Sequence, residues 1–192
     1  MARATPLGDW AVSVYDHVYR VCHELDSARA AVPPLLCVEV RRCRALRRLS
    51  DGVRVHAGDR IGVLHLNNRA VVQIHGAGRR PIAIGLEFRR GLFRSLRRLA
   101  FEAQPGRPFA GVTAFTAVTI FHRQLQRLGF EIEPQGLWWP RLTGLYQCRL
   151  LAVLHPDGPG RLVRLPTRRA ERLWMSRQRL VARYGGALRE AV

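Results

Sequence analysis

The chain reads DGVRVHAGDRIGVLHLNN from Asp51 to Asn68, and this stretch decides the fold. Asp51-Gly52 and Gly58-Asp59 are typical of tight turns, because glycine reaches positive φ without steric cost and aspartate hydrogen-bonds to nearby backbone. Apolar residues alternate after the first turn and run together after the second, as they do in short strands. The pattern therefore predicts strand structure across residues 53–66.

Asn67 and Asn68 lead into an apolar run over residues 70–75, for which two structures are open. Asparagine tolerates positive φ, so the pair can form the loop of a tight hairpin between two strands. Asparagine can equally cap a short helix. The β-branched residues of the run favour the hairpin. Its register would place six residues on one face of a sheet: Ile61, Val63, His65, Ala70, Val72 and Ile74.

His65 is the one polar side chain on that predicted face. A buried histidine that bonds to a backbone carbonyl would explain it. Alternatively, a neutral imidazole that lines a pocket could act as an acid, a base or a ligand. In that case the candidate partners are Asn67, Asp59 and His155, the last of which ends a predicted strand. The two interpretations stay open at the level of sequence.

The charge of the chain is extreme, with 32 arginines, no lysine and 14 acidic residues giving a net charge of +18. Exclusive use of arginine is typical of a GC-rich bacterial genome. Codon bias does not remove carboxylates, however, so a positive field remains. Such a field attracts polyanions, which include nucleic acid, anionic lipid and acidic glycans. A solvated surface without a dedicated partner is the alternative.

The length of 192 residues predicts a single domain over 1–192, with 186–192 as a tail. No apolar run approaches the roughly 20 residues that span a bilayer, and the first residues do not resemble a secretory signal. We therefore expect a cytoplasmic protein, with a peripheral position at the inner face of the membrane as an alternative. Four cysteines without metal-ligand spacing are expected to be small buried apolar side chains: Cys22, Cys37, Cys43 and Cys148.

The remaining elements follow from periodicity and from caps. Apolar residues at helical spacing predict helices at 9–25, 82–103 and 110–128, and apolar runs predict strands at 35–43, 130–133 and 146–155. A strand over 171–175 should precede Ser176, a natural N-cap, and a short helix that ends at Gly185. The expected fold is α+β, a small mixed or antiparallel sheet packed by three main helices and a short C-terminal helix.

The predicted helix 82–103 carries an apolar stripe on one side and four arginines on the other: Arg90, Arg94, Arg97 and Arg98. A basic amphipathic helix suits a membrane surface or an anionic polymer. It equally suits a surface helix with solvated arginines. Gly91 costs this helix about 1 kcal/mol relative to alanine, without breaking the pattern.

Two local features follow the predicted helix 110–128. Gly129 fits a left-handed C-terminal cap, with Phe130 as the apolar contact that accompanies it. Glu131 and Glu133 then share one face of a short strand. Paired carboxylates are found in glycosidases, but alternate acids on an edge strand are more typical of an ordinary solvated face.

Signatures of known enzyme classes are absent from the sequence. The seven histidines form no HxxxH pair, and there is no GxSxG elbow, P-loop or GxGxxG motif. The sequence therefore predicts no metal site and no cofactor, and it leaves open whether the protein is an enzyme.

Four segments resemble YkoP-like proteins in order and spacing. The first is Asp51-Gly52 with Gly58–Asn68, and the others are Ser95–Ala100, Ala114–Thr119 with Leu128–Glu131, and Trp174–Arg177 with Leu180 and Arg183–Gly185. The resemblance extends over residues 8–186. It implies a bacterial domain that occurs alone or fused to the C-terminal side of polysaccharide deacetylases. It therefore implies a role near envelope polysaccharide or lipid metabolism, with a deacetylase or another envelope enzyme as partner, and it assigns no catalytic residue.

Three functional hypotheses result. The first is an accessory or binding module that the arginines of helix 82–103 hold near anionic lipid or glycan. The second is an enzyme of unrecognised type that uses His65. The third is a non-specific nucleic-acid binder, which rests on charge alone because the chain has no recognition motif.

Overall fold

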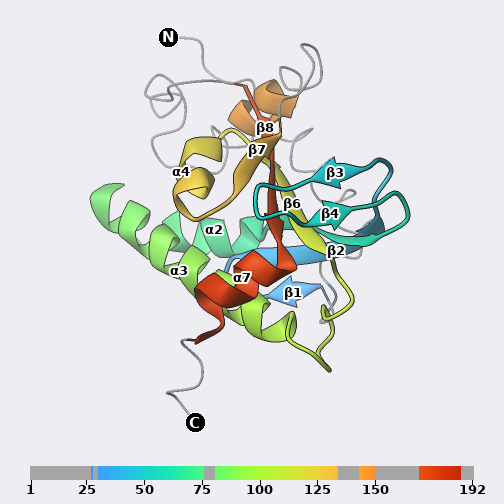
Figure 1. Ribbon diagram of the computed structural model, residues 1–192. Helices are drawn as coiled ribbons and strands as arrows, with labels where there is room; N and C mark the ends of the chain where they lie inside the picture. The colour runs from blue at the N-terminus through green and yellow to red at the C-terminus, as the bar shows by residue number, and fades with distance from the viewer. Residues whose placement is uncertain (1–26, 28–29, 76–80, 134–142, 150–168, 187–192) are drawn as a thin grey trace.

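A six-stranded mixed sheet forms the centre of the molecule (Figure 1). The computed structural model describes residues 27, 30–75, 81–133, 143–149 and 169–186. In spatial order the strands are β1 (Ala31–Val32), β2 (Leu36–Arg42), β5 (Arg60–Leu66), β6 (Ala114–Thr119), β8 (Glu171–Ser176) and β7 (Glu131–Glu133). β5 and β6 are parallel, and the other neighbours are antiparallel. The predicted α+β class with a mixed sheet is confirmed.

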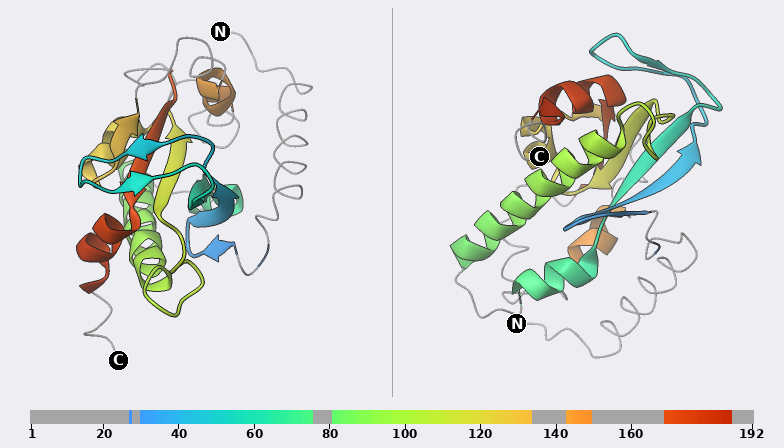
Figure 2. Two further views of the ribbon diagram at one scale, coloured as in Figure 1. Left: turned by 45° about the vertical axis from the view of Figure 1, so that its right-hand side comes forward. Right: turned by 90° about the horizontal axis from the view of Figure 1, so that it is seen from below.

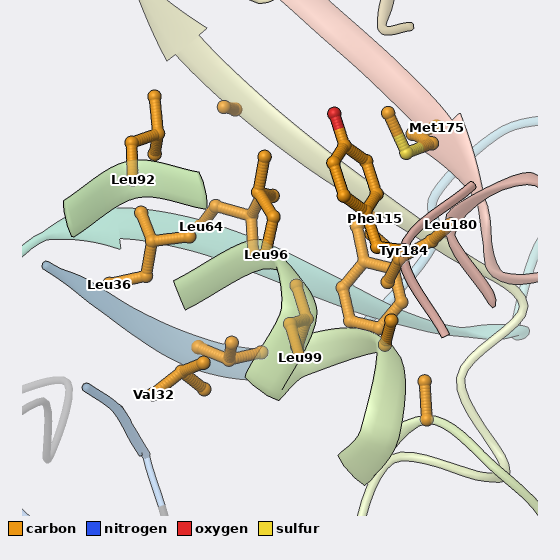
Figure 3. Close-up of a cluster of buried hydrophobic side chains, with 14 of the residues drawn as sticks. Val32, Leu36, Leu64, Leu92, Leu96, Leu99, Phe115, Met175, Leu180 and Tyr184 are labelled. Atoms are coloured by element: carbon orange, nitrogen blue, oxygen red, sulfur yellow. The ribbon is translucent and has the colours of Figure 1, made fainter. Parts of the chain in front are cut away.

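Helices cover one face of this sheet. They are α2 (Asn68–His75), α3 (Pro81–Glu102), α4 (His122–Arg127) and the short C-terminal helix α7 (Arg177–Tyr184). Figure 3 shows Leu92, Leu96 and Leu99 of α3 facing Leu36 and Leu64 of the sheet. All five belong to one buried apolar cluster, which Phe115, Met175, Leu180 and Tyr184 extend beneath α7. Burial of this cluster is the main favourable term in folding.

A two-stranded hairpin covers part of the opposite face (Figure 2). It is formed by β3 (Arg47–Arg48) and β4 (Arg54–Val55), and its apolar residues pack on the sheet. The buried cluster beneath it consists of Cys43, Leu49, Val55, Ile61, Ala114 and Trp174. β3 was not predicted, and the strand predicted over 53–66 is divided at Gly58, whose φ of 91° turns the chain between β4 and β5.

Most predicted elements with strong local signals are confirmed. β2, α3, β7 and β8 match the strands and the helix expected at 35–43, 82–103, 130–133 and 171–175. The Ser176 hydroxyl accepts a hydrogen bond from the Arg179 N–H at 2.9 Å, as its N-cap assignment requires. Gly129 has a φ of 97°, and the buried Phe130 follows it, as expected of a left-handed helix cap.

The hairpin predicted across Asn67-Asn68 is wrong, and the alternative helix is correct. Residues 70–75 lie within α2, so they do not pair with β5. The Asn67 side chain accepts a hydrogen bond from the Ala70 N–H at 3.4 Å, and its carbonyl accepts one from Val71 at 3.1 Å. This helix cap and the burial of Val71 on the core outweigh the β-propensity of the run.

The helix predicted over 110–128 is also wrong in its first half. Residues 114–119 form β6, and only His122–Arg127 are helical, as α4. β6 pairs with β5 on one side and β8 on the other, and Ala114–Ala117 are buried. A strand buried on both faces has no alternating polar residues, so its apolar positions matched helical spacing by chance.

The strand predicted over 146–155 is wrong where the structure describes it, because residues 143–149 are helical. The Gln147 side chain accepts from the Ile120 N–H at 2.8 Å and donates to the Val118 carbonyl at 2.6 Å. The helix at 143–149 thereby satisfies backbone groups at the end of β6 through this side chain, and it does not add a strand to the sheet. The predicted helix 9–25, residues 150–155 with His155, and the predicted tail beyond residue 186 lie outside the described residues.

Candidate functional site

His65 lies near the end of β5, on the sheet face opposite α3. Its register partner on β2 is Cys37, and Glu39 lies two residues further along the same face. His65 Nε2 is 3.2 Å from Glu39 Oε2, and the two side chains are only 17% and 14% exposed. The imidazole is therefore held against a carboxylate, where the sequence had suggested an apolar setting.

A histidine–carboxylate pair can orient an imidazole and select its tautomer. The carboxylate favours the protonated form of the ring, and such a pair can serve in proton transfer. Arg41 Nε also contacts Glu39, through Oε1, so the carboxylate is shared between a permanent cation and the imidazole. The charge of Glu39 is thus partly compensated by the Arg41 guanidinium.

Asn67 is two residues beyond His65, at the end of β5, whereas Asp59 lies just before the start of that strand. Asn67 directly follows β5, and its side chain is used to cap α2. Asp59 precedes β5, so about 20 Å of extended strand separates it from His65. Its carboxylate accepts a hydrogen bond from the His56 N–H at 2.8 Å within the turn. His155 lies outside the described residues, so His65 and Asn67 remain of the predicted candidates, and the structure adds Glu39 as the contact of His65.

The four arginines predicted to bind an anion all lie on the solvent side of α3. Arg94 forms an ion pair with Glu87 at 3.1 Å, and Arg98 forms one with Glu102 at 2.5 Å. Within the part of the chain that the structure describes, Arg90 and Arg97 have neither an ion-pair nor a hydrogen-bond partner. Five arginines and two glutamates give α3 a net charge of +3.

A shallow hollow of about 170 Å³ opens at the other end of the sheet. Val53 of the hairpin, residues 110–113 and the first two residues of α7 line it. It is remote from His65, because Ile61 and Ala114, which begin the paired stretch of β5 and β6, lie at this end. The sequence did not predict the hollow, since its walls come from three segments that are distant along the chain.

A family model for the YkoP domain matches residues 9–184. The chain belongs to the YkoP domain family. The matched range includes His65, Glu39, the arginines of α3 and the residues that line the hollow. The comparisons found no match among curated proteins and none among solved structures.

Two carboxylates that the sequence analysis treated as solvated, Glu131 and Glu133, have structural roles in this YkoP domain. Glu131 accepts a hydrogen bond from the Ser50 N–H at 2.9 Å, and Glu133 accepts one from Trp174 Nε1 at 2.8 Å. Glu133 also contacts Arg47 of β3 at 2.7 Å. The paired carboxylates therefore attach the β3–β4 hairpin to the sheet. The sequence shows that the two carboxylates share one face of a strand, but it does not identify the residues that they contact.

The described residues contain no group of three or more histidine, cysteine, aspartate or glutamate side chains arranged to hold a metal ion. Across the same residues, no helix combines the length and the apolar character needed to cross a bilayer. α3 is long enough at 22 residues, but its arginines make it too polar.

Proposed function

We propose that this YkoP domain is an accessory binding module that holds an anionic partner of the bacterial envelope on the solvent face of α3. The observation that carries the proposal is the pair Arg90 and Arg97, which are exposed and have no carboxylate partner among the described residues. A guanidinium without a partner binds phosphate or carboxylate groups without first breaking an ion pair.

The surrounding charges reinforce this pair. Arg94 and Arg98 are more than half exposed even in their ion pairs, so they add to the field at the same surface. The excess of 32 arginines over 14 acidic residues extends that field over the molecule. Each arginine near an anionic surface contributes about 1 kcal/mol, so replacement of two should weaken binding roughly 30-fold.

The envelope setting rests on the resemblance to YkoP-like proteins and on what that resemblance implies about polysaccharide deacetylases. An anionic glycan or an anionic lipid would both supply the charge that α3 complements. A deacetylase or another envelope enzyme would then be brought to that polymer or surface. Nucleic acid is disfavoured because the described elements include no recognition helix or RNA-binding motif.

The test compares two double variants of equal charge change. Arg90→Gln/Arg97→Gln removes the unpaired arginines of α3, and Arg48→Gln/Arg54→Gln removes two exposed arginines of the β3–β4 hairpin. Binding to heparin, to phosphatidylglycerol vesicles and to a duplex oligonucleotide is measured across a salt series that includes about 0.15 M.

We expect the α3 variant to lose roughly 30-fold in affinity for heparin or vesicles, and the hairpin variant to lose much less. Equal losses in the two variants would contradict a binding surface on α3. A wild-type protein that binds the oligonucleotide well at about 0.15 M, and neither heparin nor vesicles, would replace this function with nucleic-acid binding.

A second candidate function rests on the contact between His65 and Glu39. We infer that this pair could serve an enzyme as its general acid or base, with Asn67 beside it. Cys37 faces His65 across the β2–β5 register. His65→Ala should then abolish an activity and lower the unfolding free energy by less than about 1 kcal/mol. A loss of 2 kcal/mol or more would identify a structural histidine.

A further inference from the structure

Two large apolar side chains are exposed at the start of α3. Ile82 is 80% exposed and Leu86 is 49% exposed. They lie four residues apart and are therefore neighbours on the helix surface. In Figure 1 and in the right-hand view of Figure 2, this end of α3 extends beyond the sheet. Neither residue belongs to the buried apolar cluster, which takes its buried α3 members from the later turns, Leu92 to Ala100.

The later turns of α3 are covered, which shows how the first turns differ. α7 packs against this part of the helix, and the ring of Tyr184 meets that of Phe93 edge-on at 6.1 Å. α7 ends at Tyr184, so its cover does not reach Ile82. The first two turns thus leave an apolar ridge facing solvent.

The unpaired arginines continue this ridge. At 100° per residue, Ile82, Leu86, Arg90 and Arg97 fall within a sector of about 80° around the helix. Arg89 lies beside them, 5.8 Å from the centre of the Phe93 ring. The exposed side chains of this sector are therefore apolar in the first two turns and guanidinium groups further along the helix.

We propose that this face docks onto the surface of an anionic lipid bilayer. Ile82 and Leu86 enter the boundary between headgroups and acyl chains, and Arg90 and Arg97 bind lipid phosphates. The inference rests on the proposed function and selects lipid from among the anionic partners. A soluble polyanion would use the arginines alone, whereas a bilayer also removes the apolar side chains from water.

The experiment measures co-sedimentation of the full chain with phosphatidylglycerol–phosphatidylcholine vesicles, and binding to heparin in parallel. Ile82→Ser/Leu86→Ser removes the apolar ridge without changing charge. Leu145→Ser is the matched control, because Leu145 is 56% exposed in the helix at 143–149. Arg90→Gln/Arg97→Gln serves as the charge variant. Thermal unfolding of each variant establishes that the exposed substitutions leave the fold intact.

We expect the apolar variant to lose about tenfold in vesicle affinity for each residue replaced, with heparin binding unchanged. The charge variant should lose affinity for both. If the apolar variant binds vesicles as tightly as Leu145→Ser, lipid docking is refuted. In that outcome, a loss of heparin binding by the charge variant would leave the proposed function standing, while unchanged binding would refute both.

Discussion

Two glycines of α3 separate the helix propensity of a residue from its packing on the sheet. A Cβ atom built at Gly85 meets nothing within 4 Å. A Cβ atom at Gly91 would lie 2.7 Å from Leu35 Cδ1 and 3.0 Å from Leu35 Cγ. The same substitution to alanine is therefore expected to leave the packing unchanged at Gly85 and to overpack it at Gly91.

The magnitudes follow from the two contributions. Replacement of glycine by alanine in a helix interior stabilises by about 1 kcal/mol, and this applies at both positions. At Gly91 the added methyl also overpacks the core, which costs about 1–3 kcal/mol. Leu35 is fully buried and its N–H donates to Ser95 Oγ at 2.9 Å, so it is held on both sides. Gly91→Ala should thus be about 1–3 kcal/mol less stable than Gly85→Ala.

Urea unfolding followed by circular dichroism measures the comparison directly. Gly85→Ala should raise the unfolding free energy by about 0.5–1 kcal/mol above that of the unsubstituted protein. Because the propensity contribution is common to both variants, their difference reports the contact with Leu35. Equal stabilisation by the two substitutions would refute the close approach of α3 to the segment before β2.

Three further outcomes test the core. Gly62→Ala should lower the unfolding free energy by about 1–3 kcal/mol in urea titration, because its Cβ would lie 2.5 Å from the Phe115 ring. Ser95→Ala should cost about 1–3 kcal/mol in the same assay, since it leaves the buried Leu35 N–H without an acceptor. Burial raises the pKa of Tyr184 above its usual value of about 10, so its contribution to stability is complete below pH 10 and is lost as the pH rises through the native pKa. Tyr184→Phe should flatten this alkaline decline in chemical unfolding across pH, and an unchanged profile would contradict the assignment.

Local signals predicted the ends of elements well. Ser176 and Gly129 were assigned as helix caps from residue type and position, and both have the expected geometry. Such assignments succeed because a cap involves hydrogen bonds among residues only a few positions apart. α3 was equally predictable from the sequence. Over its 22 residues, a single exception such as Gly91 has little effect on the helical pattern of apolar residues.

The candidate site was less predictable from the sequence than the fold. His65 was selected as a polar residue within an apolar run, but its partner Glu39 belongs to another strand, 26 residues away. Register between β2 and β5 decides that contact, and no residue near His65 in sequence specifies it. In the same way, the ion pairs that leave Arg90 and Arg97 unpaired depend on which rotamers bring Glu87 and Glu102 to their neighbours.

By itself, the amino-acid sequence determined the α+β class, the glycine-aspartate turns before β4 and β5, the caps at Gly129 and Ser176, the basic helix and the large positive charge. Each of these depends on composition or on contacts within a few residues. Only the tertiary structure decided that residues 114–119 lie at the centre of the sheet and that Ile82 and Leu86 face solvent. The physical reason is that apolar side chains look alike in sequence whether a strand is buried on both faces or a helix extends past its core. Contacts with segments that are distant along the chain decide which of these two structures an apolar run adopts.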